Sequence, residues 1–158
     1  TRAPYPSVHR EVGRAERAGI VSSRRLGNVR LIRANMTSPY FEGLASVLVR
    51  AFGPPALLGR ALATIGGVRS AYLFGSWAAR FEGLEGTRPV GDLDVLVLGD
   101  PDRSALFEAA SQVSGRLGRE VQVTIRDADW LVAGEGSFHD TLCSRPLVPI
   151  EIGHPGDQ

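Results

Sequence analysis

Apolar residues in the middle of the chain recur every three or four positions, the spacing that places them on one face of a helix. A first stripe runs from Phe41 to Phe52, and a second runs from Ala56 to Ile65 after Gly53-Pro54-Pro55 interrupts the pattern. We therefore expect two consecutive helices. Runs of β-forming residues follow and predict four strands, at Val68–Phe74, Asp92–Leu98, Glu120–Ile125 and Leu147–Ile152.

Further helices are expected between and after these strands. Asp100 and Pro101 suit the N-cap and first position of a helix, with an apolar stripe that ends near Gly118. Shorter helical candidates lie at Trp77–Phe81, Asp127–Leu131 and Ser137–Cys143, and the glycine-rich stretch 82–91 is typical of a loop. This order of elements predicts an α+β fold with a small mixed β-sheet and flanking helices.

The first residues follow a different plan. Ser7 is a candidate N-cap for a helix over 8–18 that Gly19 ends. Two extended runs, Ile20–Arg25 and Val29–Arg33, surround Leu26-Gly27-Asn28, where Gly and Asn tolerate the positive φ of a tight turn. Asn35–Tyr40 breaks the pattern and is expected to be a linker. We therefore predict two domains, residues 1–36 and 37–158.

Charge also separates the two parts of the chain. Residues 1–33 carry a net charge of +6, whereas the other 125 residues carry −5. All 18 basic residues are arginine, which excludes a Walker-type phosphate lysine and a lysine nucleophile. Cys143 is the sole cysteine, so an intrachain disulfide and a Cys-rich zinc site are excluded, and we expect a buried thiol.

The overall composition is that of an average globular protein, with 43% apolar and 22% charged residues. No apolar run approaches the roughly 18 residues that a membrane span requires. We therefore expect a cytoplasmic protein that does not associate with a membrane.

The strongest chemical pattern combines Leu73-Phe74-Gly75-Ser76 with Gly91-Asp92-Leu93-Asp94. Side chains alternate faces along a strand, so Asp92 and Asp94 point the same way and can hold Mg²⁺ with hard oxygen ligands. Gly75 lets the backbone approach a triphosphate, and the Ser76 hydroxyl can bond a phosphate oxygen. Arg80 is a further phosphate-binding candidate, or a structural partner.

These residues resemble the signature of the minimal nucleotidyltransferases of the DNA polymerase β superfamily, over about residues 41–152. The resemblance implies a nucleotidyltransferase fold, triphosphate binding at Gly75 and Ser76, and catalytic metal binding at Asp92 and Asp94. It also implies that an NTP is the donor substrate, and it allows a toxin-antitoxin partner.

One position departs from that family. The third strand of the family carries a further carboxylate, and the matching residue here is Gln122. An amide is neither an anionic ligand nor a base, which puts transfer activity in question. Glu120 lies on the same face and can compensate, or it is simply solvated, and Gln122 can contact a base or ribose instead.

The first 34 residues resemble the recognition helix and wing of bacterial winged-helix regulators, so a partial winged helix precedes the other domain. The resemblance implies DNA binding. The exposed apolar stripe of this segment can pack onto the nucleotidyltransferase domain or onto a second copy, which makes a homodimer a reasonable expectation. Major-groove contacts are expected from the helix, and phosphate or minor-groove contacts from the hairpin. The residues are Ser7, His9, Arg10 and Arg14, followed by Arg24, Arg25 and Arg30.

Two functions therefore stand side by side. The first is Mg²⁺-dependent transfer of a nucleoside monophosphate from an NTP to an acceptor that the residues do not identify. The second is DNA-binding transcriptional regulation by a protein whose nucleotidyltransferase domain has lost transfer. Asp92 and Asp94 favour the first, and Gln122 with the basic N-terminal segment favours the second.

Overall fold

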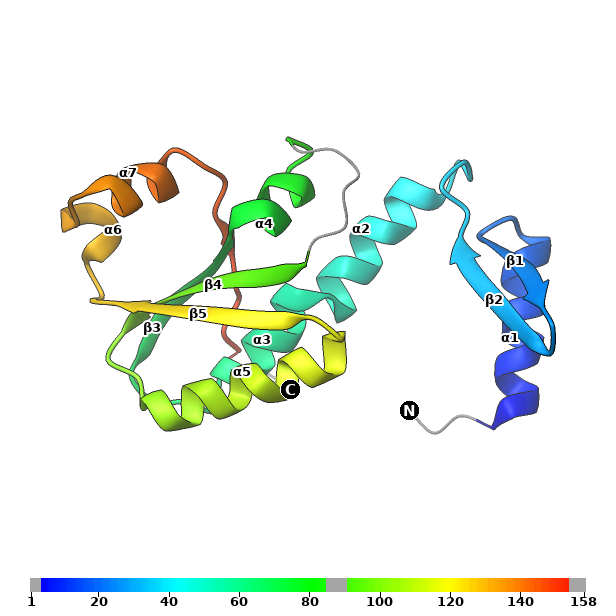
Figure 1. Cartoon of the computed structure of the whole chain (residues 1–158), viewed down its shortest axis with the longest axis horizontal. Coiled ribbons are helices and arrows are strands. Elements are labelled where there is room, and N and C mark those ends of the chain that lie inside the picture. Colours follow the sequence, from blue (N-terminus) through cyan, green and yellow to red (C-terminus); the bar gives the residue numbers. More distant parts are fainter. Residues whose placement is uncertain (1–3, 85–90, 154–158) are drawn as a thin grey trace. The chain divides into compact units, whose positions relative to one another are not determined.

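The computed structural model describes residues 4–84 and 91–153, and its contacts divide the chain into two compact units. The N-terminal unit extends to Leu48 and the C-terminal unit begins at Val49. Helices flank a small mixed sheet, so the predicted α+β class is confirmed (Figure 1). Most of the predicted loop 82–91 lies outside the described residues.

The N-terminal unit contains helix α1 (Tyr5–Arg17) and a hairpin of strands β1 (Val21–Leu26) and β2 (Val29–Ala34). The strands pair antiparallel, with Val21 opposite Ala34 and Leu26 opposite Val29. This confirms the predicted helix and hairpin. Gly27 turns the chain with a φ of 58°, while no described residue other than glycine has a positive φ. Asn28 therefore does not use the left-handed region that the sequence suggested.

Helix α1 begins earlier than expected. Pro4 is the N-cap and Pro6 occupies the first turn, where the fixed φ of proline suits a helix and its missing N–H costs nothing. Ser7 is consequently inside the helix rather than its cap, and its N–H bonds the Pro4 carbonyl at 3.0 Å. Ala18 caps the other end, and Gly19 follows with a φ of 70°.

Helix α2 (Phe41–Phe52) matches its prediction, whereas α3 spans Pro54–Leu62 instead of Ala56–Ile65. Pro in the first turn of α3 starts the helix early, for the same reason as in α1. Within the described residues, Phe41–Leu62 is long and apolar enough to cross a membrane by length and composition alone, which our sequence reading missed. A single helix of this kind is weak evidence for a membrane span; only 6% of its apolar window is buried, although Leu58 and Leu62 pack into the core.

The sheet of the C-terminal unit has four described strands in the order β5-β4-β3-β6. Strand β3 pairs antiparallel with β4 and β6, whereas β4 and β5 run parallel. This makes the sheet mixed, as predicted, and leaves β5 with one neighbour. The bounds agree closely with the sequence except that β6 is shorter: β3 (Val68–Phe74), β4 (Asp92–Gly99), β5 (Glu120–Arg126) and β6 (Val148–Pro149).

Besides α3, four described helices accompany these strands: α4 (Gly75–Phe81), α5 (Arg103–Leu117), α6 (Trp130–Ala133) and α7 (Ser137–Cys143). Three starts differ from prediction, among them that of α6, which begins at Trp130 rather than Asp127. The Gly75-Ser76 turn is already part of α4, and α5 is capped by Asp102 rather than Asp100. The Asp102 carboxylate accepts the N–H groups of Ser104 and Ala105 at 2.8 and 3.2 Å, which satisfies two free donors of the first turn.

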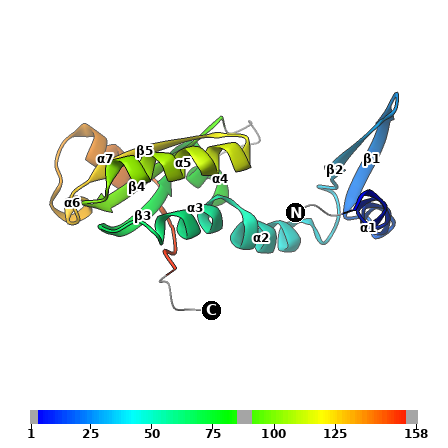
Figure 2. The same cartoon turned by 90° about the horizontal axis from the view of Figure 1, so that it is seen from below.

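Each face of the sheet carries its own apolar cluster. Leu93, Val95 and Val97 of β4 pack with residues of α3 and α5, and α5 lies in front of β4 and β5 in Figure 2. Leu96 and Leu98 face the opposite way and pack with Leu142 of α7 and residues of α6. Because both faces of β4 are covered, this strand is apolar over most of its length.

The expectation of a buried thiol at Cys143 is wrong, because the side chain is exposed at the end of α7. Its sulfur lies 3.5 Å from Nε2 of His139, one helical turn away. The imidazole itself is only 15% exposed and stands edge-on against Trp130. The neighbouring aromatic rings therefore bury the histidine, while the cysteine faces outward.

Candidate functional site

Asp92 and Asp94 lie at the beginning of β4, on one face of the strand, with buried Leu93 between them on the other face. Both carboxylate side chains are half-buried. The described residues form no salt bridge with either of them. The structure thus brings together two anionic groups at the point where the central strand starts.

The Gly75 backbone lies directly against Asp94. Strand β3 ends at Phe74, whose register partner on β4 is Asp94, so the next residue meets the carboxylate. A Cβ atom added at Gly75 would stand 2.2 Å from Asp94 Oδ2, and φ at Gly75 is 70°. No other residue type fits this position without displacing the carboxylate.

Burial and the nearby charge of Asp92 raise the pKa of Asp94 above its ordinary value. Loss of hydration disfavours the ionised carboxylate, and a second carboxylate on the same face adds repulsion. The ionised pair therefore stores unfavourable electrostatic energy that a cation relieves. Carboxylates with raised pKa values of this kind are common at functional sites.

Strand β5 brings Gln122 and Glu120 to the same face. Parallel pairing sets Glu120 beside Asp92 and Gln122 beside Asp94. The Gln122 amide donates a hydrogen bond to Asp92 Oδ2 at 3.0 Å. Its observed partner is therefore a carboxylate of the site, while Glu120 is exposed beside it.

Ser76 and Arg80 lie four residues apart on α4, so they share a face of that helix. Ser76 directly follows the glycine that touches Asp94, and its hydroxyl forms no hydrogen bond with another described residue. Arg80 is half-buried in the last turn, where its charge suits the carboxyl end of a helix. The structure thus places the predicted phosphate-binding residues on one short helix.

A small pocket that the sequence did not reveal adjoins Gly75. It has a volume of about 130 Å³ and is lined by Phe74, Gly75, Phe138, Thr141, Leu142 and Arg145. The Phe138 ring is 41% exposed and meets Phe74 edge-on, with centroids 6.1 Å apart. Helix α7, far along the chain from Gly75, supplies three of these six lining residues, and no local motif marks the pocket.

The donor set suits a divalent metal with few protein ligands. The described residues contain no group of three or more His, Cys, Asp and Glu side chains placed to hold a metal, so Glu120 does not complete a three-carboxylate site there. Two carboxylates are nevertheless the common protein contribution to Mg²⁺, which keeps several waters and takes further oxygens from substrate phosphates. Asp92 and Asp94 fit that role.

The predicted DNA-contacting residues of α1 lie on two faces. Ser7, Arg10 and Arg14 are spaced three and four residues apart and share one face. His9 lies elsewhere, with its ring 6.0 Å from that of Tyr5. Arg10 and Arg14 both contact Glu11, at 3.5 and 3.2 Å. The helix therefore presents one polar face on which an acidic side chain already engages the two arginines.

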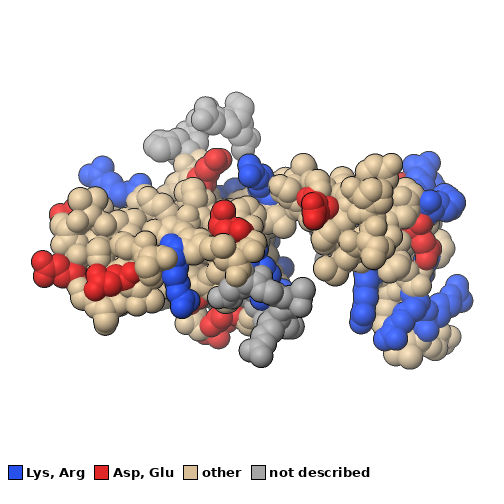
Figure 3. Space-filling view, turned by 90° about the horizontal axis from the view of Figure 1, so that it is seen from above, with Lys and Arg blue, Asp and Glu red and all other residues tan. Residues whose placement is uncertain are grey.

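The hairpin arginines also differ from one another. Arg24 and Arg25 are exposed on β1 and form no salt bridge with a described residue. Arg30 on β2 bonds Glu16 and Ser23, so its charge is offset within the unit. Arginine side chains gather on this unit in Figure 3. Arg24 and Arg25 are the ones best placed to meet a phosphate.

Comparison of the chain with protein-family models, with curated proteins and with solved structures finds no match.

Proposed function

We propose that the C-terminal unit binds a nucleoside triphosphate with Mg²⁺ and transfers its nucleoside monophosphate to a hydroxyl or similar acceptor group, with pyrophosphate as the leaving group. The observation that carries this proposal is the contact between Asp94 and Gly75, beside Asp92. It joins a carboxylate pair that favours a cation to a backbone that tolerates close approach of a ligand. Phosphoryl transfer requires charge neutralisation and positioning more than covalent chemistry.

Each residue has a role in this reaction. Asp92 and Asp94 hold Mg²⁺, which supplies the charge neutralisation on the phosphates when it is bound. Gly75 admits the triphosphate, and the Ser76 hydroxyl donates to a phosphate oxygen. Gln122 fixes the orientation of Asp92 through its amide hydrogen bond. The acceptor is a protein, an RNA or a small molecule in the cytosol.

The pocket beside Gly75 suits the nucleobase. Its volume of about 130 Å³ is below the roughly 300 Å³ of common small-molecule sites, so it accommodates part of a nucleotide. The exposed Phe138 ring offers a stacking surface, and Thr141 and Arg145 offer polar contacts at the rim.

Calorimetric titration of each nucleoside triphosphate, with and without Mg²⁺, tests the proposal. The comparison uses the wild-type chain, an Asp92→Asn, Asp94→Asn double variant and Glu108→Gln, which alters an exposed carboxylate on α5. We expect metal-dependent binding by the wild type and the Glu108 variant, and none by the double variant. A wild-type chain that binds no triphosphate would overturn the proposed activity.

A second function is favoured by two observations, namely that Gln122 stands where a third carboxylate would serve and that Arg24 and Arg25 are exposed on the hairpin. We propose as the alternative a DNA-binding regulator in which the nucleotidyltransferase unit senses nucleotide without transfer. A toxin-antitoxin partner is compatible with either function.

Fluorescence anisotropy with labelled duplex DNA separates the two functions. An Arg24→Ala, Arg25→Ala variant should bind more weakly than wild type, and the slope of log affinity against log salt should fall by about 2, because two phosphate contacts are lost. Arg116→Ala, at the exposed end of α5, is the control. Equal binding by all three chains would argue against DNA recognition by the hairpin.

A further inference from the structure

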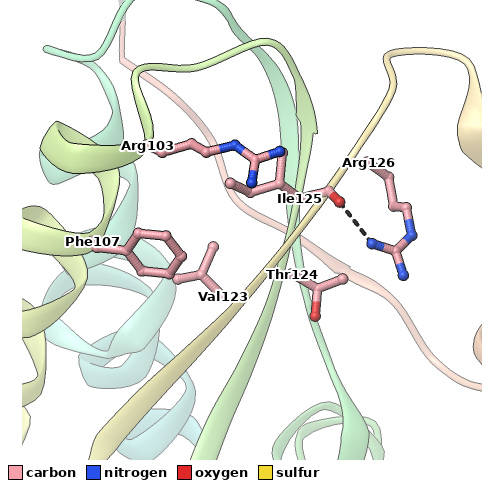
Figure 4. Close-up of a pocket in the computed structure, with 6 residues that line it drawn as sticks. All are labelled: Arg103, Phe107, Val123, Thr124, Ile125 and Arg126. Carbon is pink, nitrogen blue, oxygen red and sulfur yellow. Dashed lines mark hydrogen bonds between the residues drawn. The ribbon is translucent and has the colours of Figure 1, made fainter.

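Among the described strands, β5 pairs with β4 alone, so it is an edge strand with an open side. Edge strands present unpaired main-chain groups to which another strand can add. A groove of about 380 Å³ lies along this edge. Its walls are Arg103 and Phe107 of α5 and residues 123–126 of β5, shown in Figure 4.

Two hydrogen bonds identify which main-chain groups face outward. The Val121 N–H donates to Ser114 Oγ at 2.9 Å rather than to β4, and the Ile125 carbonyl accepts from Arg126 Nη1 at 2.8 Å (Figure 4). The N–H and C=O of one strand residue point to the same side of the strand, and those of the next residue point to the other side. The N–H and C=O of Val123, two residues from Val121 and Ile125, therefore face outward as well. The Val121 carbonyl, the N–H and C=O of Val123 and the Ile125 N–H therefore remain for a partner strand.

We propose that β5 pairs antiparallel with β5 of a second copy of this chain, about a two-fold axis at Val123. This pairing sets Glu120 opposite Arg126 of the second copy and, just beyond the strand, Arg119 opposite Asp127. Each end of the paired strands thus carries opposite charges facing each other. The charge pattern of the strand is self-complementary, as a two-fold interface requires.

Other registers lose this match. A shift by two residues in either direction keeps every side chain on its face but leaves Glu120 and Arg126 each opposite an uncharged residue. An unrelated acidic strand would match Arg126 but would meet Glu120 at the other end. A second copy is therefore the partner that the charges favour.

The available hydrogen bonds fit the same register. Around the axis, Val123 of each copy exchanges two main-chain bonds with its counterpart. The Ile125 N–H reaches the Val121 carbonyl of the second copy. The remaining pair would join the Val121 N–H to the Ile125 carbonyl, and these are the two groups that Ser114 and Arg126 already satisfy. In this register each outward main-chain group of Val121, Val123 and Ile125 has a partner.

The pairing also extends the apolar face. Val121, Val123 and Ile125 are half-buried on the side that α5 covers, and Phe107 of α5 is 53% exposed at the groove. On the other face, Arg126 of the second copy comes beside Glu120, whose register partner is Asp92. The second copy therefore contributes a cation next to the candidate site.

Sedimentation velocity of the full chain over a range of concentrations tests the pairing. The single variants Glu120→Arg and Arg126→Glu each place like charges opposite one another at both ends, so dimerisation should weaken at least about tenfold. The double variant Glu120→Arg, Arg126→Glu restores opposite charges and should dimerise like wild type. Wild-type chains that stay monomeric, or single variants that dimerise as well as wild type, would overturn the proposal.

Val123→Pro provides an independent test. It removes the outward N–H at the axis without removing a bond to β4, a position where edge strands tolerate proline. Dimerisation should be lost while the circular dichroism spectrum is kept, and a folded variant that still dimerises contradicts the register. A monomeric wild type that binds a synthetic acidic peptide at this edge would assign the groove to another partner. The Asp92→Asn, Asp94→Asn variant should dimerise normally. The test of strand pairing is therefore independent of the test of nucleotide binding.

Discussion

One carboxylate in each unit has a shifted pKa, and the two shifts are in opposite directions. In the N-terminal unit, Ser23 and Arg30 bond Glu16 and lower its pKa, with the Ser23 hydrogen bond the larger cause. In the C-terminal unit, burial and Asp92 raise the pKa of Asp94. The first carboxylate joins a helix to a hairpin and stabilises its surroundings. The second is placed at a cost to stability, which is typical of a residue kept for binding or catalysis.

Burial separates the units in the same way. None of the described residues of the N-terminal unit is buried, and Tyr5, Leu26 and Met36 are each more than 60% exposed. The C-terminal unit contains all of the described buried side chains, including Leu73, Leu93 and Leu96, which are fully enclosed. Hydrophobic burial is the main source of folding free energy. The C-terminal unit therefore supplies the stability, and the N-terminal unit depends on local polar contacts.

The largest expected contrast comes from matched truncations of apolar side chains. Leu106→Ala in α5 should lower the free energy of unfolding by about 2–5 kcal/mol, because the side chain is 1% exposed in a close-packed core. Ile32→Ala in β2, where the side chain is 45% exposed, should cost under about 1 kcal/mol. Urea denaturation followed by circular dichroism measures both. Similar costs would show that the N-terminal unit has a core after all.

Matched glycine substitutions sharpen the comparison. Gly27→Ala should cost about 1 kcal/mol, since φ is 58° and no atom lies within 4 Å of the added Cβ. Gly75→Ala should cost about 2–3 kcal/mol, because the same backbone strain is joined by a clash with Asp94 Oδ2. It should also abolish triphosphate binding in the calorimeter. Equal costs at the two glycines would contradict the contact between Gly75 and Asp94.

Asp94→Asn should stabilise the metal-free protein at neutral pH, with a melting temperature roughly 1–3 °C higher. Folding raises the pKa of the Asp94 carboxyl. Such a group stabilises the folded protein at pH values below its pKa in the unfolded chain, and this stabilisation is lost as the pH rises through its pKa in the folded protein. The variant escapes this loss, so the difference should vanish in acid. Calorimetric melting over pH 3–8 measures it, and a destabilised variant at neutral pH would contradict the stored repulsion.

The smallest effect is expected at Glu16, with the opposite sign. Because folding lowers the pKa of Glu16, this carboxylate stabilises the folded protein at pH values above its pKa in the unfolded chain. The stabilisation is lost as the pH falls through its pKa in the folded protein. Glu16→Gln should therefore speed hydrogen exchange of the hairpin amides by roughly two- to fivefold at neutral pH and not in acid. Glu11→Gln is the control, because the Glu11 carboxylate bonds Arg10 and Arg14 of its own helix. Unchanged hydrogen exchange in the Glu16 variant would show that the Glu16 carboxylate does not stabilise the hairpin.

The sequence by itself determined the local elements and the residues of the carboxylate site. Strand β3 and helix α7 have the bounds that their composition predicts, and alternation along β4 placed Asp92 and Asp94 on one face. The misplaced helix starts, at Ser7 and Asp100, came from competing local signals: proline in the first turn of α1 and a better-placed cap at Asp102. Each start was misplaced by only a few residues, because capping depends on residues close to the end of the helix.

Tertiary structure decided what those residues touch. The parallel register of β4 and β5 gave Gln122 its bond to Asp92, and the end of β3 set Gly75 against Asp94. Helix α7 brought Phe138 to the pocket, and the sheet order left the edge of β5 open. Each of these depends on pairing between segments far apart in the chain, whose energy comes from shared burial and long-range hydrogen bonds rather than local propensity. The alternation of residues along one strand determines which side chains share a face. The segments that pack beside the strand determine which groups those side chains contact.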